Sequence, residues 1–213
     1  MTGSSGQMPV AVLLAGGWAS RMGGGDKGLR EIGGVPVLRR VLDRARGWTD
    51  RVLLSANDDP ERFAGLDWLA GVPVLADGVP GRPGPLAGIL AAMDWAADNM
   101  PERSHILSLP CDTPFLPAGL WPALAVQGRG VAMAVGPDGN RQPTVALWPI
   151  TLRHDLRRAL AEEGLRKVGA FAARHGLVEV TFPLAPGGID PFFNINSPAD
   201  LAEAETLIHN AGP

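Results

Sequence analysis

The sequence lacks most of the features that mark secreted, membrane-spanning and nucleic-acid-binding proteins. Its one cysteine excludes an internal disulfide framework and fits a reducing cytoplasm. No apolar run approaches the roughly 20 residues of a membrane span, and the polar start lacks the basic and apolar regions of a signal peptide. A net charge of −3 provides no positive field for nucleic acid or an anionic membrane. We therefore expect a soluble cytoplasmic protein that binds neither nucleic acid nor membrane.

The four histidines are scattered, without the spacing of zinc ligands or of a catalytic triad. Cys111 has no accompanying base, so we interpret it as a small buried residue rather than a nucleophile. Phosphoryl transfer needs neither kind of group.

The chain is long enough to bury one sizeable core, with 213 residues and 46% hydrophobic content. Residues 1–8 are small and polar, and we interpret them as a disordered lead or a remnant of protein expression. We expect residues 9–213 to form a single domain.

Short apolar runs alternate with helical patterns, which predicts an α/β fold with a mostly parallel sheet and helices on both sides. The predicted strands cover residues 10–15, 51–55, 72–76, 106–109, 131–135 and 145–148. Apolar residues recur at helical spacing over residues 38–45 and 86–93. A last helix should begin at Ser197, with Pro198 in its first turn and Asp200 completing a capping box. Functional residues should directly follow strands, because ligands bind beyond the carboxyl ends of such sheets.

A glycine-rich loop follows the first predicted strand. Residues 16–28 contain six glycines together with Arg21 and Lys27. Backbone N–H groups of such a loop can surround phosphate oxygens while the two cations neutralise charge. The loop is not a Walker motif, since Gly28 stands where Ser or Thr is needed, and its dinucleotide-like glycines begin too far from the strand. A flexible surface loop is the alternative, but the cations favour an anion site.

These residues and several later motifs resemble the molybdenum cofactor guanylyltransferases, the MobA family. The similar segments are Leu-Ala-Gly-Gly at 14–17, Arg-Met-Gly-Gly at 21–24, Asp-Lys-Gly-Leu at 26–29, and residues 84–88, 110–114, 143–147, 166–168 and 193–198. The resemblance implies a Rossmann-like three-layer nucleotidyltransferase fold. It also implies Mg²⁺-dependent transfer of GMP from GTP to molybdopterin, which forms the guanine dinucleotide cofactor and pyrophosphate.

The resemblance further implies a nucleotide-binding N-terminal half and an acceptor-binding C-terminal half. The implied nucleotide contacts are Leu14, Ala15, Gly16, Gly17, Lys27, Ser55 and Asp77. Ser55 departs from the members that have Asn there, and Asn57, two residues later on the same face of an extended strand, is an additional candidate for this contact.

Gly88 and an arginine cluster each have an ordinary structural alternative. Gly88 lies near the start of a predicted helix, where it allows the close approach of a bound nucleotide or, equally, close helix packing. The cluster, which we interpret as a solvated helix face, consists of Arg39, Arg40, Arg44 and Arg46.

Asp112 is the candidate Mg²⁺ ligand. It follows an apolar strand, and Mg²⁺ prefers one or two protein carboxylates together with phosphate oxygens and waters. The alternative role is an N-cap for a helix near Pro117. Because an acceptor phosphate is already ionised, Arg21, Lys27 and Mg²⁺ on Asp112 are sufficient catalytic groups for positioning and charge stabilisation.

The acceptor site is assigned to polar residues in the second half of the chain. Asn194 and Asn196 alternate with Ile195, so both amides share one face, where they suit the edge of a pterin. Capping of the last helix is the alternative for Asn196. Arg166 and Lys167 suit the molybdopterin phosphate, or else an exposed helix end.

Other functions stay open, although one of them, a sugar or isoprenoid nucleotidyltransferase, would not explain the Asn194 and Asn196 pair. A cytidylyltransferase could act on the same acceptor, although those enzymes tend to carry Leu-Ala-Ala-Gly where this chain has Leu-Ala-Gly-Gly at 14–17. A non-catalytic nucleotide-binding module could instead deliver the cofactor. We expect a monomer that docks transiently with molybdenum-insertion proteins or molybdoenzyme chaperones.

Overall fold

One mixed sheet organises the chain. The computed structural model describes residues 8–16, 27–56, 60–76, 84–127 and 130–211. In this part of the chain, seven strands form a sheet in the order β5-β4-β1-β6-β8-β7-β9. They are β1 (Val10–Leu14), β4 (Val52–Ser55), β5 (Val74–Leu75), β6 (His105–Pro110), β7 (Ala132–Val135), β8 (Arg141–Pro149) and β9 (Val178–Thr181). All neighbouring strands are parallel except β8, which is antiparallel to both β6 and β7.

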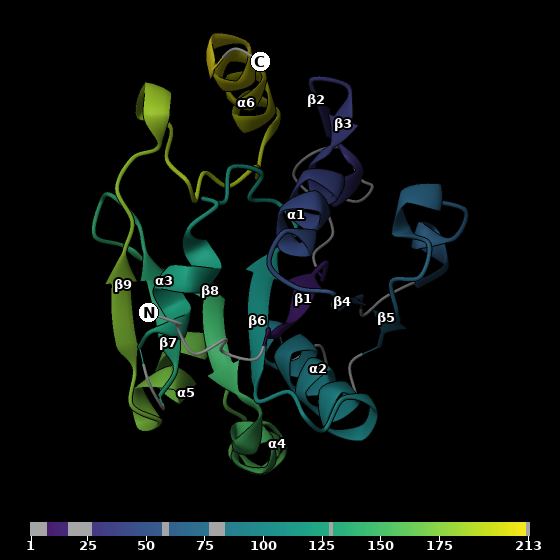
Figure 1. Ribbon diagram of the computed structural model, residues 1–213, viewed down its shortest axis with the longest axis vertical. Helices are drawn as coiled ribbons and strands as arrows, with labels where there is room; N and C mark the ends of the chain where they lie inside the picture. The colour runs from purple at the N-terminus through teal and green to yellow at the C-terminus, as the bar shows by residue number, and fades with distance from the viewer. Residues whose placement is uncertain (1–7, 17–26, 57–59, 77–83, 128–129, 212–213) are drawn as a thin grey trace, which may run out of the picture.

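Helices cover both faces of the sheet, as the sequence predicted (Figure 1). One layer contains α1 (Val37–Arg46) and α3 (Leu120–Ala125). The other contains α2 (Pro85–Asn99), α4 (Arg153–Ala161) and α5 (Val168–Arg174). Alternate residues of β1 enter the two layers, because successive side chains of a strand point to opposite faces. The α/β class with a mostly parallel sheet is therefore confirmed.

A small third cluster lies beyond the sheet. It joins the hairpin of β2 (Glu31–Ile32) and β3 (Val35–Pro36) to α6 (Pro198–Ala211), which stand together at the upper end of Figure 1. Gly33 and Gly34 both have positive φ, as a two-residue hairpin turn requires. The Gly33 N–H donates to both carboxylate oxygens of Glu205 at 3.0 Å, so the hairpin and α6 are also tied by a charged hydrogen bond.

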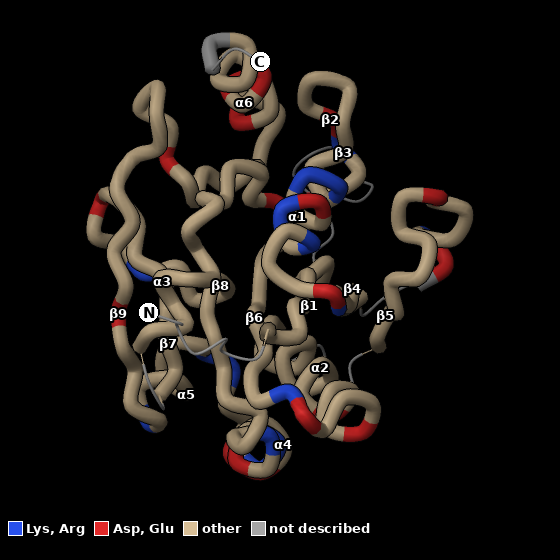
Figure 2. The backbone as a smooth tube through the Cα atoms, viewed as in Figure 1, with Lys and Arg blue, Asp and Glu red and all other residues tan. Residues whose placement is uncertain are grey.

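The structure corrects the interpretation of one member of the arginine cluster on α1, Arg40, whereas Arg39, Arg44 and Arg46 are exposed as expected. Charged residues of both signs follow one another along this helix in Figure 2, and Arg39 and Arg46 each lie 3.8 Å from the Asp43 carboxylate. Arg40, in contrast, is half-buried and donates to the Ile32 carbonyl at 2.6 Å. Arg40 therefore supports the β2–β3 hairpin and is not part of a solvated face.

The predicted strands are all present, but their lengths differ. The strand expected at 72–76 contains only Val74 and Leu75, whereas the one expected at 145–148 is part of the longer β8. The two-residue strands β2 and β3 were not predicted, and neither was β9, whose half-buried and exposed residues alternate. No helix among the described residues is long and apolar enough to cross a bilayer.

Helix α2 lies very close to β1 and β4 at Gly88. A Cβ atom there would collide with Ser55 Oγ and lie 2.9 Å from Leu14 Cδ2. The absence of a side chain at this position therefore allows the helix to contact both strands where they end. This geometry favours the packing role of Gly88 over contact with a bound nucleotide.

We expect Gly88→Ala to lower the free energy of unfolding by about 1–3 kcal/mol, because the added methyl group overpacks this contact. Urea unfolding followed by circular dichroism measures the change. Gly169→Ala on α5 is the matched control: its Cβ would meet no atom within 4 Å, so stability should stay equal or rise by up to about 1 kcal/mol. Equal stability of the wild-type and Gly88→Ala proteins would contradict the packing role.

Candidate functional site

The carboxyl ends of three neighbouring parallel strands lie side by side at one edge of the sheet, the edge formed by strand ends. Leu14, the last residue of β1, pairs with Ser55 of β4 and with Pro110 of β6. Ala15 continues the pairing, since its N–H donates to the Ser55 carbonyl at 2.9 Å. The residues that follow these strands are thus brought to a common edge, as expected for a ligand site in an α/β sheet. Gly16 is exposed there.

Asp112 lies at this edge, two residues after β6, and is half-buried. Its backbone carbonyl accepts a hydrogen bond from Ile195 N at 3.0 Å. The alternative role as a helix N-cap is wrong, because α3 begins at Leu120 and its N-cap is Gly119. The described residues contain no group of three or more His, Cys, Asp or Glu side chains that could hold a metal ion by themselves.

Lys27 and Asn196 meet over the same edge. Lys27 lies in the short 3-10 helix η1 (Lys27–Leu29), and its ammonium donates to Asn196 Oδ1 at 2.7 Å. Asn194 and Asn196 are exposed while Ile195 is fully buried, which confirms that the two asparagines share one face. Three segments therefore meet beyond the carboxyl ends of the strands. They are the end of the glycine-rich segment, the turn at Asp112 and the segment before α6.

The start of α6 has the predicted capping box. The Asp200 carboxylate accepts hydrogen bonds from Asn196 N at 2.7 Å and from Ser197 N at 2.8 Å. In return, Ser197 Oγ accepts from Asp200 N at 3.2 Å. The backbone N–H of Asn196 is the main cause that holds the pKa of Asp200 below its ordinary value of 3.8, with smaller contributions from Ser197 and the Lys27 charge.

Arg62 is a neighbour of the site that the sequence did not reveal. It lies in η2 (Pro60–Phe63) and donates to the Ala15 carbonyl at 2.6 Å. Its guanidinium also lies 4.7 Å from the centre of the Phe63 ring, within the range of a cation–π interaction. Nothing in the local spacing marks Arg62, because the contact joins residues 47 apart in sequence.

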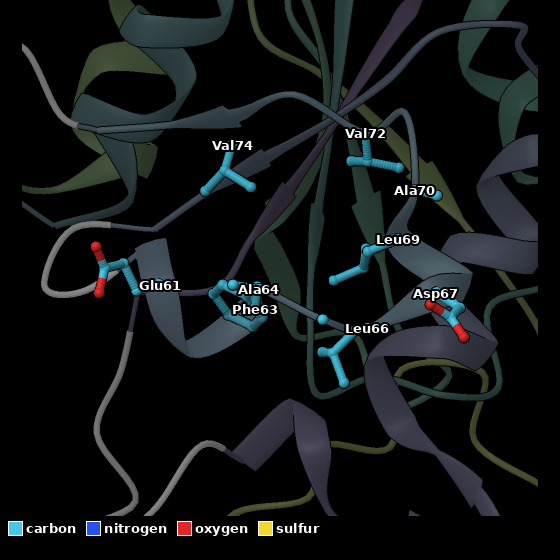
Figure 3. A pocket seen from close by; sticks show the side chains of 10 residues that line it. Glu61, Phe63, Ala64, Leu66, Asp67, Leu69, Ala70, Val72 and Val74 are labelled. Atoms are coloured by element: carbon cyan, nitrogen blue, oxygen red, sulfur yellow. The ribbon is translucent and has the colours of Figure 1, made fainter.

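An apolar pocket of about 490 Å³ is lined by Phe63, the residue after this arginine, and by the chain that follows it (Figure 3). Residues of η2, of η3 (Asp67–Leu69) and of the chain from Ala70 to Val74 line this open pocket. Figure 3 shows apolar side chains around the pocket, including Phe63, with Glu61 and Asp67 at its two ends. Its lining residues include neither Lys nor Arg, so we do not assign it to triphosphate.

Arg166 and Lys167 belong to a different region of the fold. Arg166 donates to the carbonyls of Leu160 and Leu165 at 3.1 and 2.9 Å, at the end of α4. Arg166 lies in the chain between β8 and β9. The end of β8 pairs with the start of β6, and the start of β9 pairs with the start of β7. Both positions are at the opposite end of the sheet from Asp112, which follows the end of β6. The structure therefore groups Arg166 with α4 and does not bring it to Asn194 and Asn196.

The remaining predicted site residues are Gly17, Arg21, Asn57 and Asp77, which lie outside the described residues.

Comparison with known proteins gives a consistent result. The model of the MobA-like NTP transferase domain family matches residues 11–177. This chain belongs to that family. Relatives named molybdenum cofactor guanylyltransferase occur in Rhodopseudomonas palustris (strain BisB5) and Nitrobacter hamburgensis, at 50% and 48% identity, each with 92% of both chains covered. The predicted nucleotidyltransferase class is thereby confirmed.

A solved structure with low sequence identity to this chain has the same fold. It is a molybdopterin-guanine dinucleotide biosynthesis protein A from Archaeoglobus fulgidus, with a TM-score of 0.72 at 21% identity. The match covers 94% of this chain and 98% of that chain. The two proteins therefore share a fold although few of their residues are identical.

The capping box predicts a pH-dependent stability. Because the pKa of Asp200 is lowered on folding, its charged form stabilises the folded state above 3.8, and this contribution is lost as pH falls through the folded-state pKa. We expect Asp200→Asn to be less stable than the wild-type protein at about pH 6, by about 1 kcal/mol or less, and the difference to shrink below about pH 3.8.

Urea unfolding at several pH values measures this difference. Glu203→Gln, at an exposed position of the same helix, is the matched control and should show no such change. A difference between wild type and Asp200→Asn that grows on acidification would contradict the sign of the shift.

Proposed function

We propose that this chain transfers GMP from GTP to molybdopterin and forms molybdopterin guanine dinucleotide and pyrophosphate. The observation that carries the proposal is the convergence of Lys27, Asp112 and the Asn194–Asn196 segment at the carboxyl edge of the sheet. This convergence joins groups suited to a triphosphate with groups suited to a pterin. Relatives at 50% and 48% identity are named molybdenum cofactor guanylyltransferase, which supports guanine over cytosine.

In the proposed complex, GTP lies over the ends of β1 and β4. The Ala15 backbone is already bonded to Ser55 and Arg62, so it holds the start of the loop in place while the exposed Gly16 faces the nucleotide. Lys27 supplies a positive charge to the phosphates, and Arg21 adds a second. The backbone N–H groups of the glycine-rich loop complete the phosphate site.

The residues present fit Mg²⁺. Asp112 offers one partly exposed carboxylate at the strand end, and no cluster of three potential ligands occurs among the described residues. Mg²⁺ commonly binds in this way, through one or two carboxylates with the remaining positions taken by phosphate oxygens and waters. When bound, the ion would stabilise the negative charge that develops on the leaving pyrophosphate.

The transfer itself needs no general base. An oxygen of the acceptor phosphate, already ionised, forms a bond to the α-phosphorus of GTP. The bond from this phosphorus to the oxygen that bridges to the β-phosphate breaks, and pyrophosphate leaves with that electron pair. Lys27 and Arg21 stabilise the charge that shifts during this exchange, and the fixed strand ends hold the reactants in line.

In the proposed complex, molybdopterin lies over residues of the second half of the chain. The exposed amides of Asn194 and Asn196 offer donors and acceptors to the pterin edge, and Lys27 lies beside Asn196, so the two substrates would meet there. The hydrogen bonds of Arg166 to the carbonyls of Leu160 and Leu165 support a role at the end of α4 instead. We therefore leave Arg166 and Lys167 out of the proposed site.

We expect purified protein with molybdopterin and Mg²⁺ to form the dinucleotide from GTP at least about tenfold faster than from CTP, because base contacts contribute to transition-state binding. Pyrophosphate release and chromatography of the product measure the rates. Preference for CTP would overturn the base assignment but keep the mechanism. GTP binding without any product would favour a cofactor-delivery module.

We expect Lys27→Met and Asp112→Asn each to lower kcat/KM for GTP by about 10²–10³-fold, since each removes charge stabilisation from the transition state. Chelation of Mg²⁺ should abolish wild-type activity, and added Mg²⁺ should restore it. The matched control for Asp112 is Asp98→Asn, at an exposed position on α2, which should leave the rate unchanged. Unaltered GMP transfer by the Lys27 and Asp112 variants would contradict their assigned roles.

A further inference from the structure

The Asp200 carboxylate connects α6 to the two side chains that meet over the strand ends. It accepts hydrogen bonds from the N–H groups of both Asn196 and Ser197, at 2.7 and 2.8 Å. The side chain of that same Asn196 accepts from the Lys27 ammonium at 2.7 Å. A chain of hydrogen bonds therefore runs from the first turn of α6 to the cation assigned to the triphosphate.

Helix capping accounts for only part of this arrangement. A capping box requires the acid to bond the N–H of the N-cap residue, which here is Ser197. Asp200 also bonds the N–H of Asn196, which precedes the N-cap, and this is the shorter of the two contacts. With both N–H groups held, the backbone at Asn196 is fixed, and its short side chain has few positions left to occupy.

Helix α6, which carries Asp200, is held in place by its own contacts. Ala204 of α6 is fully buried against Ile32 and Ile195, and Glu205 accepts from Gly33 N in the β2–β3 hairpin. That hairpin follows η1, the element that carries Lys27. Helix α6 therefore contacts both the hairpin that follows Lys27 in sequence and the segment that contains Asn196.

A lysine on its own is poorly suited to precise placement, because its ammonium sits on a flexible four-carbon stem. A fixed acceptor reduces the positions that the ammonium samples before the reaction. The conformational entropy of the Lys27 side chain is then lost when the protein folds and not when the transition state forms.

We propose that Asp200 is a positioning residue for guanylyl transfer, which holds Asn196 so that the amide oxygen keeps Lys27 over the carboxyl ends of β1 and β6. This inference rests on the proposed function. Asp200 acts through Asn196 and Lys27 and does not itself contact the reacting atoms.

Ser197→Ala separates positioning from capping. It removes the hydroxyl that accepts from Asp200 N but leaves the carboxylate and its two bonds in place. We expect Ser197→Ala and Asp200→Ala to lower Tm to a similar extent. Only Asp200→Ala should lower kcat, by about tenfold, while the Kd for GTP measured by calorimetry changes less than about threefold, because a loosened lysine still attracts the triphosphate.

Two further variants make the test specific. Asp200→Glu should restore most of the lost kcat, since Glu at this position can still reach the N–H groups before the helix. Asp200→Ala should cause little additional loss when Lys27→Met is already present, because the two residues act in one chain of contacts. If Asp200→Ala does not fold, Asp200→Ser replaces it, since its hydroxyl keeps a polar group in the first turn of α6 but removes the carboxylate oxygen that accepts from both N–H groups.

Each outcome bears on one conclusion. Equal kcat values for the Ser197→Ala and Asp200→Ala proteins would overturn the positioning role, and so would fully additive losses in the double variant. A wild-type protein that does not transfer GMP at all would overturn the proposed function and this inference with it. An active wild-type protein with indistinguishable variants would overturn the inference alone.

Discussion

The backbone hydrogen bond from Ile195 N to Asp112 O is the contact on which the rest of the candidate site depends. It joins the turn after β6 to the segment before α6, so two distant parts of the chain lie over the same end of the sheet. Burial of Ile195 anchors that segment, and the alternation of an extended chain then turns both flanking asparagines outward. Asn196 can meet Lys27 because this register is held.

In the part of the chain that the structure describes, the β2–β3 hairpin and α6 share a small apolar cluster that is separate from the two helix layers. Fully burying a side chain such as Ile32 contributes about 1.5–3 kcal/mol, so a few such residues stabilise this region less than the two large helix layers stabilise the sheet. Polar contacts add to it, from Glu205 to the Gly33 backbone and from Arg40 to the Ile32 carbonyl. Elements with few buried contacts open more readily, and substrate exchange requires such elements near a site.

Much of the fold and part of the site could be predicted from local patterns. Apolar runs located the long buried strands, and Ser197, Pro198 and Asp200 marked the start of α6. The short strands β2 and β3 were missed, because two residues are too few for a periodicity to appear. Arg40 and Arg62 were missed as structural residues, because each bonds a carbonyl on another element and neither has a local signal.

The sequence alone determined which residue types are available, where β1 leads into a glycine-rich loop, and that Asn194 and Asn196 share a face. These properties depend on neighbours within a few residues, whose spacing is set by the geometry of a strand, turn or helix. Only the tertiary structure decided that Lys27 meets Asn196, 169 residues away, and that Arg166 lies with α4 at the other end of the sheet. The order and direction of the strands bring such residues together or keep them apart, and these follow from packing of the whole chain rather than from any one segment.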